Sequence, residues 1–152
     1  MIKIETSYSE IMEAVKERLN YIAGKRAMDA EEYFRHCACE ADIAMLQELA
    51  SEVTAEIAVR LGGFCRGYEI KADLLIYEIQ GRKATEEEVS TRRELPAILR
   101  TAVIAGIIYR WLCLTGLAGS EEWSERHDAL IANLRDKLNS FGPLVKRRHR
   151  IL

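Results

Sequence analysis

The most apolar stretch of the chain, Leu95–Gly119, decides the fold; it reads LPAILRTAVIAGIIYRWLCLTGLAG. Pro96 suits the first turn of a helix, where a missing backbone N–H costs nothing, and we expect this helix to run to about Thr115. Its apolar residues occur on nearly every side, which is typical of a helix at the centre of a core or at an interface. Small residues would let another element approach closely, namely Ala102, Ala105 and Gly106.

A membrane-spanning role is not favoured for this stretch, because Arg100 and Arg110 interrupt it. The uncharged run between them has nine residues, whereas a bilayer requires about 20 mostly apolar residues. The segment Met1–Tyr8 is mixed and charged, so we expect no signal peptide. The four cysteines do not have the spacing of a small disulfide scaffold, and we expect reduced thiols.

Helical periodicity continues on the N-terminal side. The apolar spacing predicts one helix over 9–23, closed by Gly24, and a long helix over 29–61 with a bend near 39–42. On the C-terminal side we expect a last helix, capped by Ser120. Its apolar stripe consists of Trp123, His127, Leu130, Ile131, Leu134 and Leu138.

Between these helices, the segment 68–79 alternates apolar and polar residues and is rich in strand formers, which predicts one or two short strands. The charged segment 82–94 is predicted to be an exposed loop or a short helical turn. We therefore expect a mainly α fold, a bundle of about four helices with a small β element in the middle. The single helical domain would cover 1–142 and a basic tail 143–152.

Charge is distributed unevenly along the chain. Residues 1–80 contain nine Lys/Arg and fifteen Asp/Glu, a net charge of −6, whereas residues 81–152 contain thirteen and nine, a net charge of +4. This asymmetry is compatible with head-to-tail self-association, with an anionic partner at the C-terminal end, or with local fluctuation of a solvated surface.

The chain ends SFGPLVKRRHRIL, and this tail is the best-supported functional feature of the sequence. Its candidate contact residues are Lys146, Arg147, Arg148, Arg150, Ile151 and Leu152. The basic residues could each neutralise a phosphate, although no aromatic stacking platform is interleaved with them. The apolar tip favours a different use, an arm that docks on a neighbouring protein while the arginines pair with its acids. A solvated end without a function is the third interpretation.

The segment FRHCACEAD contains five residues of metal-capable types: His36, Cys37, Cys39, Glu40 and Asp42. On a helix, Cys37 and Cys39 would point about 200° apart and could not bind one ion. His36 and Glu40 can share a face but supply two ligands, where a structural zinc site needs four. We therefore expect no metal, no cofactor and no catalytic residue, and we expect His127 to be a hydrogen-bonded packing residue.

The last two helices resemble those of the small helical head–tail connector (adaptor) proteins of tailed bacteriophages and prophages. In that family a Pro-led apolar helix is followed by a helix reading roughly Arg-aromatic-x-x-Ala-x-x-x-Leu. Here the second helix presents Arg126, His127, Ala129 and Leu134, with His127 in place of the aromatic residue and Ala129 one place early. The upstream segment ASEVTAEIAVRLGG is similar to the family's early helix, so the resemblance covers roughly residues 45–152.

The resemblance implies a non-enzymatic structural protein that forms homo-oligomeric rings between the portal and the tail. The basic tail would then contact a portal or tail protein, a neighbouring subunit or the exiting DNA. The protein would be found in the cytoplasm of a bacterial host or in the virion. The alternative is a small nucleic-acid-associated helical protein that uses the same tail.

Overall fold

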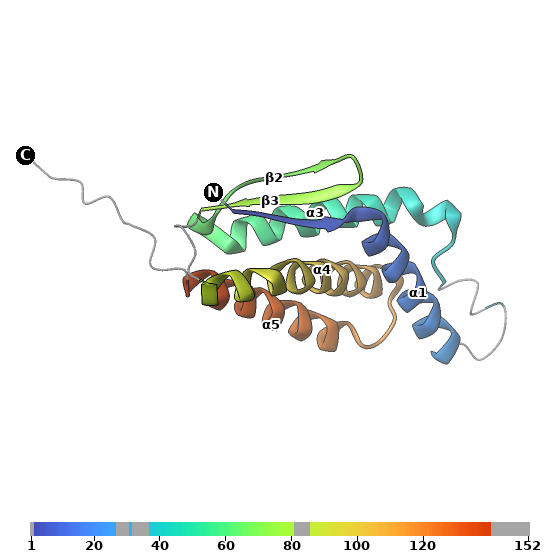
Figure 1. Ribbon diagram of the computed structural model, residues 1–152. Helices are drawn as coiled ribbons and strands as arrows, with labels where there is room; N and C mark the ends of the chain where they lie inside the picture. The colour runs from blue at the N-terminus through green and yellow to red at the C-terminus, as the bar shows by residue number, and fades with distance from the viewer. Residues whose placement is uncertain (1, 27–30, 32–36, 81–85, 141–152) are drawn as a thin grey trace, which may run out of the picture.

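The computed structural model describes residues 2–26, 31, 37–80 and 86–140, and it confirms a mainly α fold with a small β-sheet (Figure 1). The elements in chain order are β1 (Ile2–Ser7), α1 (Tyr8–Arg26), the 3₁₀ turn η1 (Glu40–Asp42), α3 (Ile43–Leu61), the 3₁₀ turn η2 (Gly62–Phe64), β2 (Cys65–Lys71), β3 (Leu74–Ile79), α4 (Glu86–Thr115) and α5 (Ser120–Asn139).

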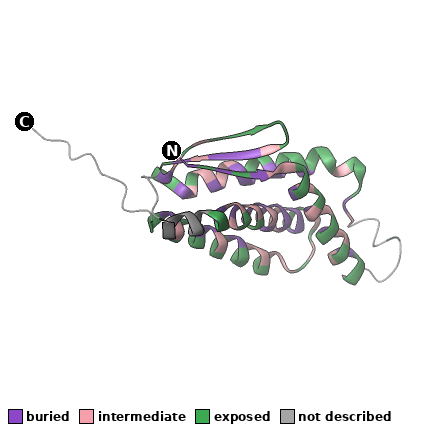
Figure 2. Cartoon of the chain, in the orientation of Figure 1, coloured by how far each residue is buried: buried purple, intermediate pink, exposed green. Residues whose placement is uncertain are grey.

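The sheet has three antiparallel strands in the order β1-β3-β2, so the prediction of one or two strands was too low. The additional strand is β1, at the N-terminal end. Its side chains alternate, with Ile2, Ile4 and Thr6 buried and Lys3 and Glu5 exposed. This alternation is the period of a strand with one face against a core. The sheet lies against the helices through that buried face (Figure 2).

The turn between β2 and β3 also fixes the start of α1. Ala72 and Asp73 have positive φ angles of 49° and 63°. The Asp73 carboxylate accepts hydrogen bonds from the Ser9 hydroxyl at 2.6 Å and from the Ser9 backbone N–H at 2.9 Å. The bond from the Ser9 hydroxyl makes the largest contribution, and together these bonds lower the pKa of Asp73 although desolvation opposes them. The hairpin thus supplies an acceptor that the first turn of a helix requires.

Helix α4 is the central element: α3 lies on one side of it and α5 on the other (Figure 1). Its fully buried residues include Leu99, Ala102, Ile107 and Ile108, which confirms a core position for the apolar stretch. The stretch Arg93–Thr115 is long and apolar enough to pass for a membrane span, and half of that window is buried within the protein. The core helix of a folded domain has the same composition.

Three predicted helix boundaries were wrong. Gly24 does not close the first helix, because α1 continues through it to Arg26. Helix α4 begins at Glu86 rather than at Pro96, because the residues before the proline are mostly good helix formers and the helix tolerates a proline that lacks one hydrogen bond. Helix α3 begins at Ile43, after the turn at 40–42, so the predicted helix over 29–61 is not continuous in its described part. The bend expected near 39–42 is present.

The expected cap of α5 was also wrong. Ser120 is already the first helical residue, and Gly119 occupies the N-cap position with a φ of 102°. Such a backbone angle is easily adopted by glycine, which has no Cβ.

Candidate interaction site

The six tail residues singled out in the sequence lie outside the described residues, as does His36. The remaining members of the metal-capable segment belong to a turn. Asp42 accepts hydrogen bonds from the Cys39 backbone N–H at 3.0 Å and from the Cys39 thiol at 3.2 Å. Desolvation, with smaller contributions from the charges of Cys39 and Asp42, raises the pKa of the Cys37 thiol. Among the side chains that the structure describes, no group of three or more metal-capable residues comes together, and no disulfide joins the four cysteines.

His127 is a packing residue, as predicted. It is 3% exposed, and its Nδ1 lies 2.7 Å from the carbonyl oxygen of Ala102, which requires an N–H at that nitrogen. Its ring fills space that Gly106 leaves open. A Cβ at position 106 would come within 2.7 Å of the His127 ring and of the Val53 side chain. The glycine expected to allow a close approach therefore accommodates the ring of His127 at the junction of α3, α4 and α5.

A chain of charges connects these helices on the side of α4 that faces α3. Arg110 binds Glu52 at 2.8 Å and Glu56 at 3.0 Å, and Arg60 binds Asp128 at 2.6 Å. Desolvation alone would lower the pKa of Arg110, but its hydrogen bonds and ion pairs with the two glutamates outweigh this and raise it. These charges are satisfied within the chain and hold α3 to α4 and α5.

A row of α3 residues that includes Glu52, the partner of Arg110, lines the cavity between α3 and α4. Met45, Glu48 and Glu52 follow one another at spacings of three and four, so they form one ridge along the helix, which we call the α3 ridge. Met45 is 46% exposed, and Glu48 has no hydrogen bond or ion pair with any described residue. Leu114 of α4 is 61% exposed and lines the same cavity as Met45 and Glu48.

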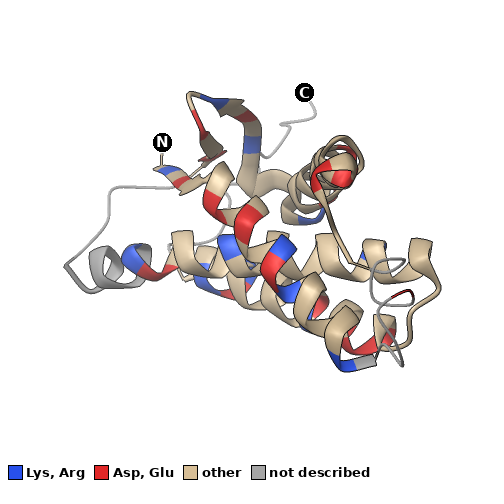
Figure 3. Ribbon diagram, turned by 90° about the vertical axis from the view of Figure 1, so that its right-hand side faces the viewer, with Lys and Arg blue, Asp and Glu red and all other residues tan. Residues whose placement is uncertain are grey.

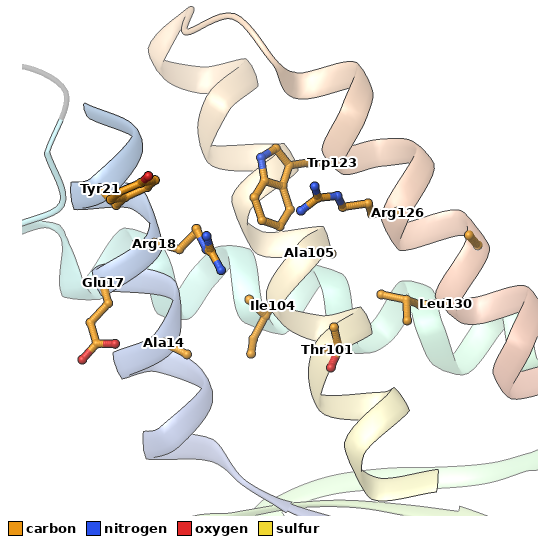
Figure 4. Close-up of a pocket in the computed structure, with 11 residues that line it drawn as sticks. Ala14, Glu17, Arg18, Tyr21, Thr101, Ile104, Ala105, Trp123, Arg126 and Leu130 are labelled. Carbon is orange, nitrogen blue, oxygen red and sulfur yellow. The ribbon is translucent and has the colours of Figure 1, made fainter. Parts of the chain in front are cut away.

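A groove of about 650 Å³ lies between α1 and α5, with α4 as its floor (Figure 4). We call it the α1–α5 groove. Its apolar surface comes from Ile104 and Ala105 of α4, Leu130 and Trp123 of α5, and Ala14 of α1. A volume of this size is typical of small-ligand and peptide sites.

Two guanidinium groups lie in this groove. Arg18 projects from α1 toward the floor, whereas its neighbour Glu17 points away (Figure 4). Arg126 of α5 lies over the Trp123 ring at 4.7 Å and binds Glu122 at 2.8 Å. Arg18 has no hydrogen bond or ion pair among the described residues. The groove is therefore apolar at its base and positively charged on its walls.

Sequence reasoning did not identify the groove or the ridge. The groove residues come from three helices separated in the chain, and only the packing of α1 and α5 on α4 brings them together. Acidic and basic positions occur on the outer sides of several helices (Figure 3), so composition does not single out Arg18 or Glu48. That neither has a partner in the described part of the chain is a property of the folded state.

No family model, curated protein or solved structure matches the chain. Function is therefore inferred from the residues and their geometry, and the resemblance to head–tail connector proteins stays a prediction.

Proposed function

We propose that this chain is a structural, self-associating subunit of a protein assembly, of the head–tail connector type, that docks on a portal or tail protein through its basic C-terminal tail. The observation that carries the proposal is the cavity between α3 and α4, where the exposed side chains of Met45 and Leu114 lie with Glu48, an acid that has no partner among the described residues. Contiguous exposed apolar surface on a folded protein marks a contact with another protein more often than it marks a solvated face. The core does not require these residues, because α3 buries seven others on its opposite side.

Charge supports the same proposal. The acidic residues of α3 belong to the half of the chain with net charge −6, and the tail belongs to the half with net charge +4. Association between such halves is attractive and is weakened by salt.

The proposal is tested by light scattering in line with size exclusion, across protein concentration and at low and high salt. We expect a mass that rises with concentration and falls with salt. A monomer at every concentration and salt would contradict it. A chain shortened after residue 142 serves as the comparison: it should still self-associate through its helices, but lose binding to the partner that the tail contacts.

The alternative, a nucleic-acid-associated protein, is favoured by one observation, the four Lys/Arg between Lys146 and Arg150. Each phosphate that these residues neutralise would steepen the salt dependence of binding. Fluorescence anisotropy with duplex DNA at about 50 and 200 mM salt tests this role. Replacement of Arg147, Arg148 and Arg150 by Ala should abolish binding, and binding that survives the replacement excludes the tail as the DNA contact.

A further inference from the structure

We propose that the α1–α5 groove binds the α3 ridge of a second copy of this chain. The inference rests on the proposed function in one respect, that the chain self-associates, and it names the two surfaces that meet. It is drawn from the charges, the lengths and the positions of those surfaces.

The charges of the two surfaces are complementary. Arg18 in the groove and Glu48 on the ridge have no partner among the residues that the structure describes. Exposed charges contribute little to stability within one chain, so leaving them unpaired costs little there. Across an interface that excludes water, the same two charges would attract each other and set the register of the contact.

The apolar parts are complementary too. Met45, the apolar member of the ridge, is 46% exposed in the isolated chain. The groove offers apolar surface at its base, from Ile104, Leu130 and the half-buried Trp123. A ridge of one helix that enters the groove between two others is the ordinary way in which helices pack.

The lengths agree. Met45 and Glu52 at the ends of the ridge are seven residues apart, as are Ala14 and Tyr21 on one wall of the groove and Trp123 and Leu130 on the other. Seven residues of α-helix span about 10 Å. A helix lying in the groove would therefore place Met45 near one end and Glu48 close to the middle, at the level of Arg18.

The two surfaces lie on opposite sides of α4. Ile104 is in the floor of the groove, whereas Cys113 lines the cavity between α3 and α4 beside the ridge. Nine residues of helix correspond to about 900°, which places these two side chains half a turn apart. Each copy would thus offer the groove on one side and, on the other, a ridge on which Met45 and Glu48 are exposed. Such a heterologous contact repeats from copy to copy, and it closes into a ring if the rotation between copies permits.

The test uses the full chain and three variants: Arg18→Glu, Glu48→Arg and the double exchange. Both residues are exposed and have no partners among the described residues, so the variants should fold, which circular dichroism and thermal melting verify. In sedimentation velocity, each single variant should associate about tenfold more weakly than the wild type, or worse, because it places like charges together. The double variant should recover the wild-type association.

Matched controls carry the same changes of charge elsewhere. Arg135→Glu lies on α5 half a turn away from Arg126, and Glu5→Arg lies on the exposed face of β1. Both should associate like the wild type. Single variants that associate like the wild type, or a double variant that stays weak, would overturn the groove–ridge contact and leave the proposed function standing. A wild type that does not associate under any condition would overturn both.

Discussion

The charged side chains on the two sides of α4 differ in whether they have partners within the chain. On the side of α3, Arg110 is bound by Glu52 and Glu56, and the charges there join helices of one chain. On the side of α1 and α5, Arg18 stands in an apolar groove without a partner among the described residues. The difference indicates that the first set of charges serves the fold, whereas the second is available to another molecule. Substitutions of the paired charges should therefore change stability, whereas substitutions of Arg18 and Glu48, which have no partners among the described residues, should change association.

The largest loss of stability is expected from a substitution at Gly106, at the junction of α3, α4 and α5. Gly106→Val would force a side chain into space held by His127 and Val53, where even a Cβ would lie 2.7 Å from its neighbours. Overpacking of this kind costs about 1–3 kcal/mol, and we expect the upper part of that range, measured as the free energy of unfolding in urea. Cys113→Val, at an exposed position of the same helix, is the control and should change stability by less than about 0.5 kcal/mol.

A smaller loss is expected from the paired charges themselves. Glu56→Gln removes an acceptor that binds Arg110 at 3.0 Å and lies 3.6 Å from Arg60. The Glu56 side chain is 34% exposed, so water compensates part of the loss, and about 1 kcal/mol is expected. Glu48→Gln is the matched change at an acid of the same helix that has no partner among the described residues. Equal losses of stability in the two variants would contradict the distinction between paired and unpaired charges.

The smallest effect on stability is expected from the Asp73 carboxylate, and it depends on pH. Its pKa is lowered in the folded protein, so the stability that it contributes is present above its unfolded pKa and is lost as pH falls through the folded value. Asp73→Asn should lower the urea midpoint at pH 7, and the difference from the wild type should disappear as the pH falls below the folded pKa of Asp73. Asp136→Asn, an exposed carboxylate on α5, should not show this pattern. A difference between Asp73→Asn and the wild type that persists at low pH would exclude the carboxylate as its cause.

The sequence correctly predicted the helices whose apolar pattern extends over many residues. The apolar stretch after Pro96 identified the central helix, and the stripe ending at Leu138 identified α5. β1 was missed because only six residues alternate there, and they were interpreted as a mixed, charged segment. The early start of α4 was missed because Pro96 was expected at its first turn, whereas the structure places the proline inside the helix.

The interaction surfaces could not be predicted in the same way. In the sequence, the row Met45, Glu48 and Glu52 cannot be distinguished from a solvated helix face. The distinction requires the partners of each charged side chain in the folded chain. The role of His127 was predicted because a histidine on an apolar stripe has few alternatives to a packing role. That Gly106 makes room for its ring depends on the crossing of helices far apart in the chain.

The most direct test of the central claim is sedimentation velocity of Arg18→Glu and Glu48→Arg mixed in equal amounts. Each variant alone has like charges at the groove–ridge contact, but in the mixture every groove can meet a ridge of opposite charge. We predict that the mixture associates like the wild type although neither component does so alone. A mixture that sediments as the sum of its two components would contradict the account.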